Sequence, residues 1–108
     1  MMNDENVIFE IILNSGDART FALKGLEVTR ENKMEEALKY LDEAGKKLNE
    51  AHKKQTLLIQ DEINGNISQL SLLMVHAQDH LMNSMTIRDL AREIIMLRKS
   101  DLERRNGE

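Results

Sequence analysis

The chain contains no proline in 108 residues. Proline removes a backbone donor and fixes φ, so it interrupts helices, and it supplies many of the turns of small β proteins. Because this chain carries no such break, we expect an all-α fold. Hydrophobic residues make up 41% of the sequence, which is enough for a core, and a chain of this length is expected to form a single domain over residues 1–108.

Composition narrows the classes of function further. The absence of cysteine excludes disulfide scaffolds, thiolate zinc sites and cysteine nucleophiles. A net charge of -4, with only 1 tyrosine, 2 phenylalanines and no tryptophan, argues against nucleic acid as a partner. The N-terminal residues are acidic, and no apolar stretch approaches the roughly 18 residues of a membrane span. We therefore expect a cytoplasmic protein without direct membrane insertion.

Two breaks divide the chain into three predicted helices. Asn and Gly tolerate the left-handed backbone that ends a helix, so the run around Gly65 predicts one break. Asn66 with Gln69, and Asn32 with Glu35, have the spacing of a capping box and predict the starts of the following helices. The expected helices span about 4–31, 33–63 and 67–105.

Apolar residues recur at helical spacing along the first two segments, with charged residues opposite. These positions are Ile8, Ile11, Ile12, Ala18, Ala22 and Leu26, then Ala37, Leu38, Leu41, Ala44, Leu48, Ala51 and Leu58. Three helices of about 30 residues, each about 45 Å long, would form a thin antiparallel bundle with a large surface. We expect such a bundle to associate with further copies. Gly16, Gly25 and Gly45 predict bends or close helix approaches.

The third segment carries a polar stripe inside an apolar run. At 100° per residue, His76, Asp79, His80 and Asn83 fall within an arc of about 100°. The opposite side holds Met74, Ala77, Leu81 and Met85. Gln78 falls on the apolar side, where its amide needs a partner from another helix or subunit. His52 lies among charged residues and is expected at the surface.

Most chemistries of such a stripe can be excluded. Histidines at i and i+4 can share a metal, but the zincin motif needs Glu where Ala77 stands, and no pair of Glu-x-x-His motifs is present. There is no nucleophile elbow and no Gly-rich phosphate loop. A neutral imidazole can itself accept a phosphoryl group, with His80 binding phosphate oxygens and Asp79 orienting a ring or holding an ion. The residues alone leave a structural polar network equally open.

The third segment resembles the active-site helix of the IIA components of the lactose/cellobiose-type phosphoenolpyruvate-dependent sugar phosphotransferase system. The matching block is Leu72-Leu73-Met74-Val75-His76-Ala77-Gln78-Asp79-His80-Leu81-Met82, followed by Ser84-Met85 and Arg88-Asp89-Leu90-Ala91. The similarity extends through Phe9-Glu10-Ile11-Ile12-Leu13, Ser15-Gly16-Asp17-Ala18-Arg19 and Glu50-Ala51-His52-Lys53. It therefore covers nearly the whole chain.

The resemblance implies a three-helix bundle that assembles as a homotrimer. It implies that His76 is phosphorylated on Nε2 by the phosphocarrier protein HPr and passes the group to a cysteine of the IIB component. His80 matches the neighbouring histidine in the phosphate environment. Asp79 matches the aspartate at the threefold axis, where three copies hold one divalent cation, typically magnesium. Three converging carboxylates repel unless protonated or bridged, so this metal is expected to be structural.

Two other classes of function stay open at this point. A helical adaptor with a buried His/Asp network would not be phosphorylated, and His76→Ala would mainly lower its stability. A metal-dependent enzyme is a more distant reading. Leu73 and Met82 are candidates for docking contacts or for the core. The sugar is bound by the membrane IIC component in the family, so lactose, cellobiose, chitobiose and other β-glucosides are equally compatible with this sequence.

Overall fold

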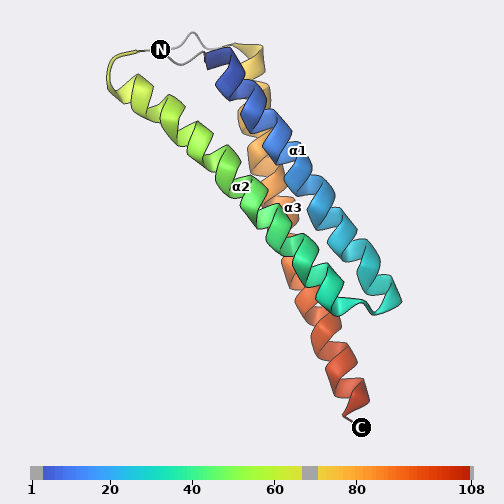
Figure 1. Ribbon diagram of the computed structural model, residues 1–108. Coiled ribbons are helices and arrows are strands. Elements are labelled where there is room, and N and C mark those ends of the chain that lie inside the picture. Colours follow the sequence, from blue (N-terminus) through green and yellow to red (C-terminus); the bar gives the residue numbers. More distant parts are fainter. Residues whose placement is uncertain (1–3, 67–70, 108) are drawn as a thin grey trace.

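The protein is an antiparallel three-helix bundle, as the sequence predicts. The computed structural model describes residues 4–66 and 71–107. Helix α1 spans Asp4–Val28 and continues as the 3-10 turn η1 at Thr29–Glu31, α2 spans Met34–Ile63, and α3 spans Leu72–Asn106. Helices α1 and α3 run in the same direction with α2 antiparallel to both (Figure 1). The bundle measures 62 × 19 × 19 Å, so it is long and thin.

The turn between α1 and α2 is set by Asn32, but not in the way the capping-box spacing predicts. Asn32 has a left-handed backbone with φ 60, and its N–H donates to the Thr29 carbonyl at 3.1 Å. The Lys33 N–H reaches back to the Val28 carbonyl at 3.2 Å, which completes a Schellman motif. The N-cap of α2 is Lys33, without a side-chain cap. The prediction that Asn32 opens the second helix is therefore wrong, because Asn32 ends the first.

The second turn has the same geometry, with Gly65 in the left-handed position at φ 90. The Gly65 N–H donates to Glu62 and the Asn66 N–H to Asp61, so Asn66 belongs to the end of α2. Helix α3 begins at Leu72, and its N-cap is Ser71, whose hydroxyl accepts from the Met74 N–H at 3.1 Å. The predicted start at Asn66 is therefore wrong, and the predicted partner at position 69 lies outside the described residues.

The core consists of two apolar clusters stacked along the bundle axis. The first is Val7, Ile8, Ile11, Ala18, Leu48, Ala51, Leu58, Ala77 and Leu81, and the second is Ala22, Ala37, Leu41, Ala44, Ala91 and Ile95. Many of these residues are alanines, which lets the helices approach closely. A Cβ built at Gly25 would lie 3.2 Å from the Ala37 carbonyl, so the predicted close approach is confirmed there.

Helix α3 also carries apolar side chains on the face that points away from α1 and α2. Leu72 is 85% exposed, Met82 57% and Leu90 59%, and Val75 and Leu97 are exposed as well. The C-terminal part of α3 extends beyond the end of the other two helices (Figure 1). We call the exposed residues Leu72, Val75, Met82, Leu90 and Leu97 the outer face of α3. Over the described ranges, none of the helices combines the length and apolarity of a membrane span.

Candidate functional site

Helix α3 places the two histidines of the polar stripe side by side. The imidazole rings of His76 and His80 have centroids 5.8 Å apart and planes inclined by 34°. His76 is exposed, whereas His80 is half-buried. Within the part of the chain that the structure describes, neither imidazole makes a hydrogen bond or an ion pair. The ring nitrogens of His76 are therefore free to meet a reactant from solvent.

His80 rests on helix α1 at a position that has no side chain. A Cβ built at Gly16 would lie 3.5 Å from His80 Nε2, which is ordinary van der Waals contact. The glycine thus brings the backbone of α1 against the second imidazole. His80 is therefore half-buried against α1, whereas His76, one turn earlier, is exposed to solvent.

A buried hydrogen bond secures α1 to α3 beside this contact. The Ser84 hydroxyl donates to the Ser15 carbonyl at 2.8 Å, and both residues are fully buried. Ser84 follows His80 by one turn, and Ser15 precedes Gly16. The bond therefore sets the position of α1 next to the second imidazole. Sequence reasoning missed this role, although two small polar residues on apolar helix faces are the signal that points to it.

Asp79 lies on the outer face of α3, between Val75 and Met82. Its carboxylate is exposed and makes no hydrogen bond or ion pair with the described residues. The described parts of one chain contain no group of three or more His, Asp or Glu side chains able to hold a metal ion. A cation site at Asp79 therefore requires carboxylates from more than one copy.

The remaining polar residues of the third segment have structural positions. Gln78 is half-buried and accepts a hydrogen bond at 2.5 Å from Gln55 of α2, which confirms that its amide needs a partner from another helix. His52 is exposed, as expected. Of the two apolar neighbours of His76, Leu73 packs against the first core cluster and only Met82 is left at the surface.

Comparison with known proteins decides the family. A family model described as "PTS system, Lactose/Cellobiose specific IIA subunit" matches residues 6–99. The chain belongs to this family. A relative from Bacillus subtilis (strain 168), the lichenan-specific phosphotransferase enzyme IIA component, is 46% identical over 98% of each chain. The N,N'-diacetylchitobiose-specific EIIA component of Escherichia coli (strain K12) is 41% identical over 86% of this chain and 80% of its own length.

Solved structures of the family have the same fold. The cellobiose-specific enzyme IIA of Bacillus anthracis superposes with a TM-score of 0.87 at 46% identity, covering 93% of this chain and 92% of its own. The chitobiose IIA of Escherichia coli, solved in complex with HPr, gives a TM-score of 0.80 at 37% identity over 93% and 97%. This chain is thus a IIA component of the sugar phosphotransferase system, a phosphotransferase protein rather than a non-enzymatic adaptor.

Proposed function

We propose that His76 accepts a phosphoryl group on Nε2 from phospho-HPr and transfers it to a cysteine of the cognate IIB component. One observation carries the proposal: His76 is exposed and unpartnered within the described chain, and its ring lies 5.8 Å from that of the half-buried His80. The neutral imidazole with its proton on Nδ1 has a lone pair on Nε2, which attacks phosphorus as the bond to the donor breaks. A thiolate later attacks phosphorus, and the imidazole leaves with the bonding electrons.

His80 is proposed to stabilise the phosphate charge. The phosphoryl group would bring nearly two negative charges to the exposed His76, and the imidazole of His80, one turn along the helix, would donate a hydrogen bond to its oxygens. Contact with Gly16 and the nearby Ser84–Ser15 bond keep that donor in place. His80 thus acts as a fixed donor beside a free nucleophile.

HPr as donor is supported by the solved complex of the chitobiose IIA relative, which is 37% identical to this chain. We place this exchange, and the onward transfer to IIB, in the cytoplasm. The relatives described above are named for lichenan, N,N'-diacetylchitobiose and cellobiose, so a β-linked oligosaccharide is the proposed substrate class of the transport system.

We further propose that three copies associate through the outer face of α3. Its exposed apolar residues repeat along the helix opposite the buried Leu81, and burial against other copies would remove them from water. Asp79 interrupts this face, so a homotrimer would bring three carboxylates together at its axis. Carboxylate oxygens suit Mg²⁺, and a bound Mg²⁺ would supply positive charge that offsets their repulsion.

The phosphoryl transfer is tested by labelling. The purified protein is incubated with radiolabelled phosphoenolpyruvate, the first enzyme of the system and HPr, and the label is followed in acid and base. We expect stoichiometric, acid-labile and base-stable label on the wild type and on His52→Ala, the matched exposed histidine, and none on His76→Ala. Undiminished label on His76→Ala, or no label on the wild type, would refute the assignment.

A further inference from the structure

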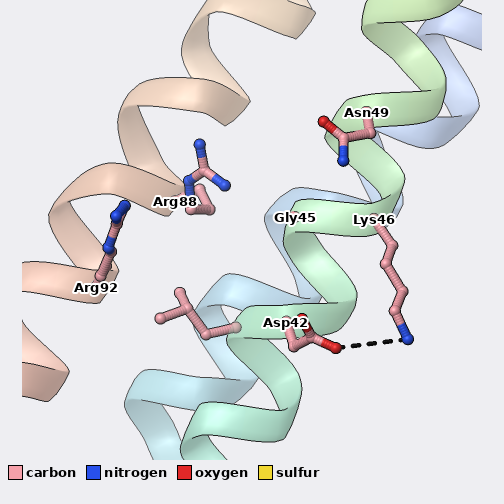
Figure 2. A pocket seen from close by; sticks show the side chains of 7 residues that line it. Asp42, Gly45, Lys46, Asn49, Arg88 and Arg92 are labelled. Atoms are coloured by element: carbon pink, nitrogen blue, oxygen red, sulfur yellow. Dashed lines mark ion pairs between the residues drawn. The ribbon is translucent and has the colours of Figure 1, made fainter.

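A polar cleft lies between α2 and α3, away from the two histidines. It has a volume of about 340 Å³ and is lined by Leu41, Asp42, Gly45, Lys46, Asn49, Arg88 and Arg92 (Figure 2). This volume is in the range of small-molecule sites. Arg88 follows His76 by 12 residues, which corresponds to about 18 Å along the helix axis. The cleft is therefore separate from the phosphoryl-transfer site.

Arg88 is held in place at the back of the cleft. Its Nε donates to the Asp89 carboxylate at 2.9 Å, and the side chain is only 26% exposed. Across the cleft stands Gly45, where a Cβ would lie 3.5 Å from Arg88 Nη1. The absence of a side chain at Gly45 lets the Arg88 guanidinium lie against the backbone of α2. The two terminal nitrogens of Arg88 are therefore preoriented and available to a ligand.

Two further donors line the same cleft. Arg92 follows Arg88 by one turn on α3, and Asn49 follows Gly45 by one turn on α2 (Figure 2). Within the described residues, neither side chain makes a hydrogen bond or an ion pair. Two guanidinium groups and an amide thus line the cleft, and each has N–H donors that no described residue accepts.

The charge of the lining is positive although the whole chain has a net charge of -4. Lys46 is paired with Glu43 at 3.3 Å and Asp42 at 3.4 Å, and these two carboxylates raise the pKa of the lysine. Its ammonium group lies beside Asp42, away from the arginines (Figure 2). Lys46 and Asp42 offset each other's charge, and Asp89 partly offsets Arg88. The surplus positive charge that a ligand meets therefore comes from Arg88 and Arg92, and Arg92 has no ion-pair partner among the described residues.

We infer that this cleft binds a small phosphate monoester, with its phosphate between Arg88 and Arg92. Guanidinium groups bind phosphate oxygens through paired N–H donors, and a dianion matches two such groups. Asn49 and Asp42 offer an amide and a carboxylate to hydroxyl groups on the ester, which favours a sugar or polyol phosphate. The lining contains no aromatic side chain on which a nucleobase could stack, and Leu41 is its one apolar residue.

Titration of the full-length protein with glucose 6-phosphate, inorganic phosphate and glucose tests the ligand class. Binding is followed by calorimetry and by the amide NMR signals of Gly45 and Asn49. We expect saturable binding of the ester, weaker binding of inorganic phosphate and no effect of glucose. Equal affinity for inorganic phosphate would overturn the assignment to an ester, and shifts that never saturate would overturn the site.

Substitutions test the residues. Removing one charge-assisted contact, in Arg88→Gln or Arg92→Gln, is expected to weaken ester binding by about tenfold or more. Arg30→Gln, which removes the same charge from an exposed position in η1, is the control and should bind like the wild type. Helical circular dichroism confirms that each variant is folded. If both cleft variants bind the ester as tightly as Arg30→Gln, the inference is wrong.

Discussion

Helix α3 presents two apolar faces that serve different purposes. The inner face buries Ala77, Leu81 and Ile95 completely against α1 and α2. The outer face leaves Met82 and Leu90 more than half exposed, and Leu90 lies about 180° around the helix from Leu81. The inner face therefore packs against helices of the same chain, whereas the apolar side chains of the outer face are left exposed to solvent. The first face folds the bundle, and the second is the face through which we propose that copies associate.

The histidine pair lies at the border between these two faces. His80 points toward α1 and contacts Gly16, while His76 is exposed. A side chain at this border can be supported by the packed inner face and still be reached from solvent. The same position would place it close to the neighbouring copies in the proposed trimer. Substitutions on the two faces should therefore separate folding from assembly.

The largest effect is expected on the inner face, from Leu81→Ala. Leu81 has no exposed surface and belongs to the first core cluster, so truncation leaves a cavity. The cost should be about 2–5 kcal/mol of unfolding free energy. Urea unfolding followed by circular dichroism at several protein concentrations measures it. A loss that vanishes at high protein concentration would mean that Leu81 supports assembly rather than the fold of one chain.

The next effect is expected on the outer face, from Leu90→Asp. Leu90 is 59% exposed in the single chain, so the folded bundle should tolerate a charge there, whereas an apolar contact between copies should not. Analytical ultracentrifugation should show trimers for the wild type and monomers for the variant, with unchanged helical content. Ile59→Asp, on the exposed side of α2, is the control and should stay trimeric. A variant that sediments like the wild type would contradict the proposed interface.

Asp79→Leu, in contrast to Leu90→Asp, should leave the trimer as stable as in the wild type or make it more stable. It replaces an exposed carboxylate inside the outer face by an apolar residue, and replacing buried charges by apolar groups often stabilises by about 1–4 kcal/mol. We expect a trimer that is as stable as the wild type or more stable, and whose dissociation no longer depends on Mg²⁺ or EDTA in sedimentation. An intact trimer that can no longer be phosphorylated would show that the role of Asp79 is not structural.

Much of the core could be predicted from sequence. The apolar period identified buried residues such as Ile11, Ala44 and Leu48, and Gly65 identified the second turn. The helix starts were misassigned because asparagine suits both a left-handed helix end and an N-cap, and hydrogen bonds of the folded backbone decide between them. At Asn32 the backbone hydrogen bonds to Val28 and Thr29 make this residue the end of the first helix.

The support of the histidine pair could not be predicted in the same way. His76 and His80 were placed together by helical spacing alone, and the structure brings them together. The contact of His80 with Gly16 joins residues 64 positions apart, and the Ser84–Ser15 bond spans 69 positions. Neither follows from a local pattern, because each depends on how α1 and α3 are aligned along the bundle.

The smallest effect is expected from Ser84→Ala, which removes the buried bond to the Ser15 carbonyl. The carbonyl keeps its helical hydrogen bond, so the cost should be about 1 kcal/mol of unfolding free energy. Thr86→Ala removes a similar hydroxyl at an exposed position, where it bonds only the Met82 carbonyl, and should cost less. Because the bond aligns α1 beside His80, Ser84→Ala should also shift the imidazole NMR signals of His80 while Thr86→Ala leaves them in place. Equal behaviour of the two variants would mean that the inner face holds the second histidine through apolar packing alone.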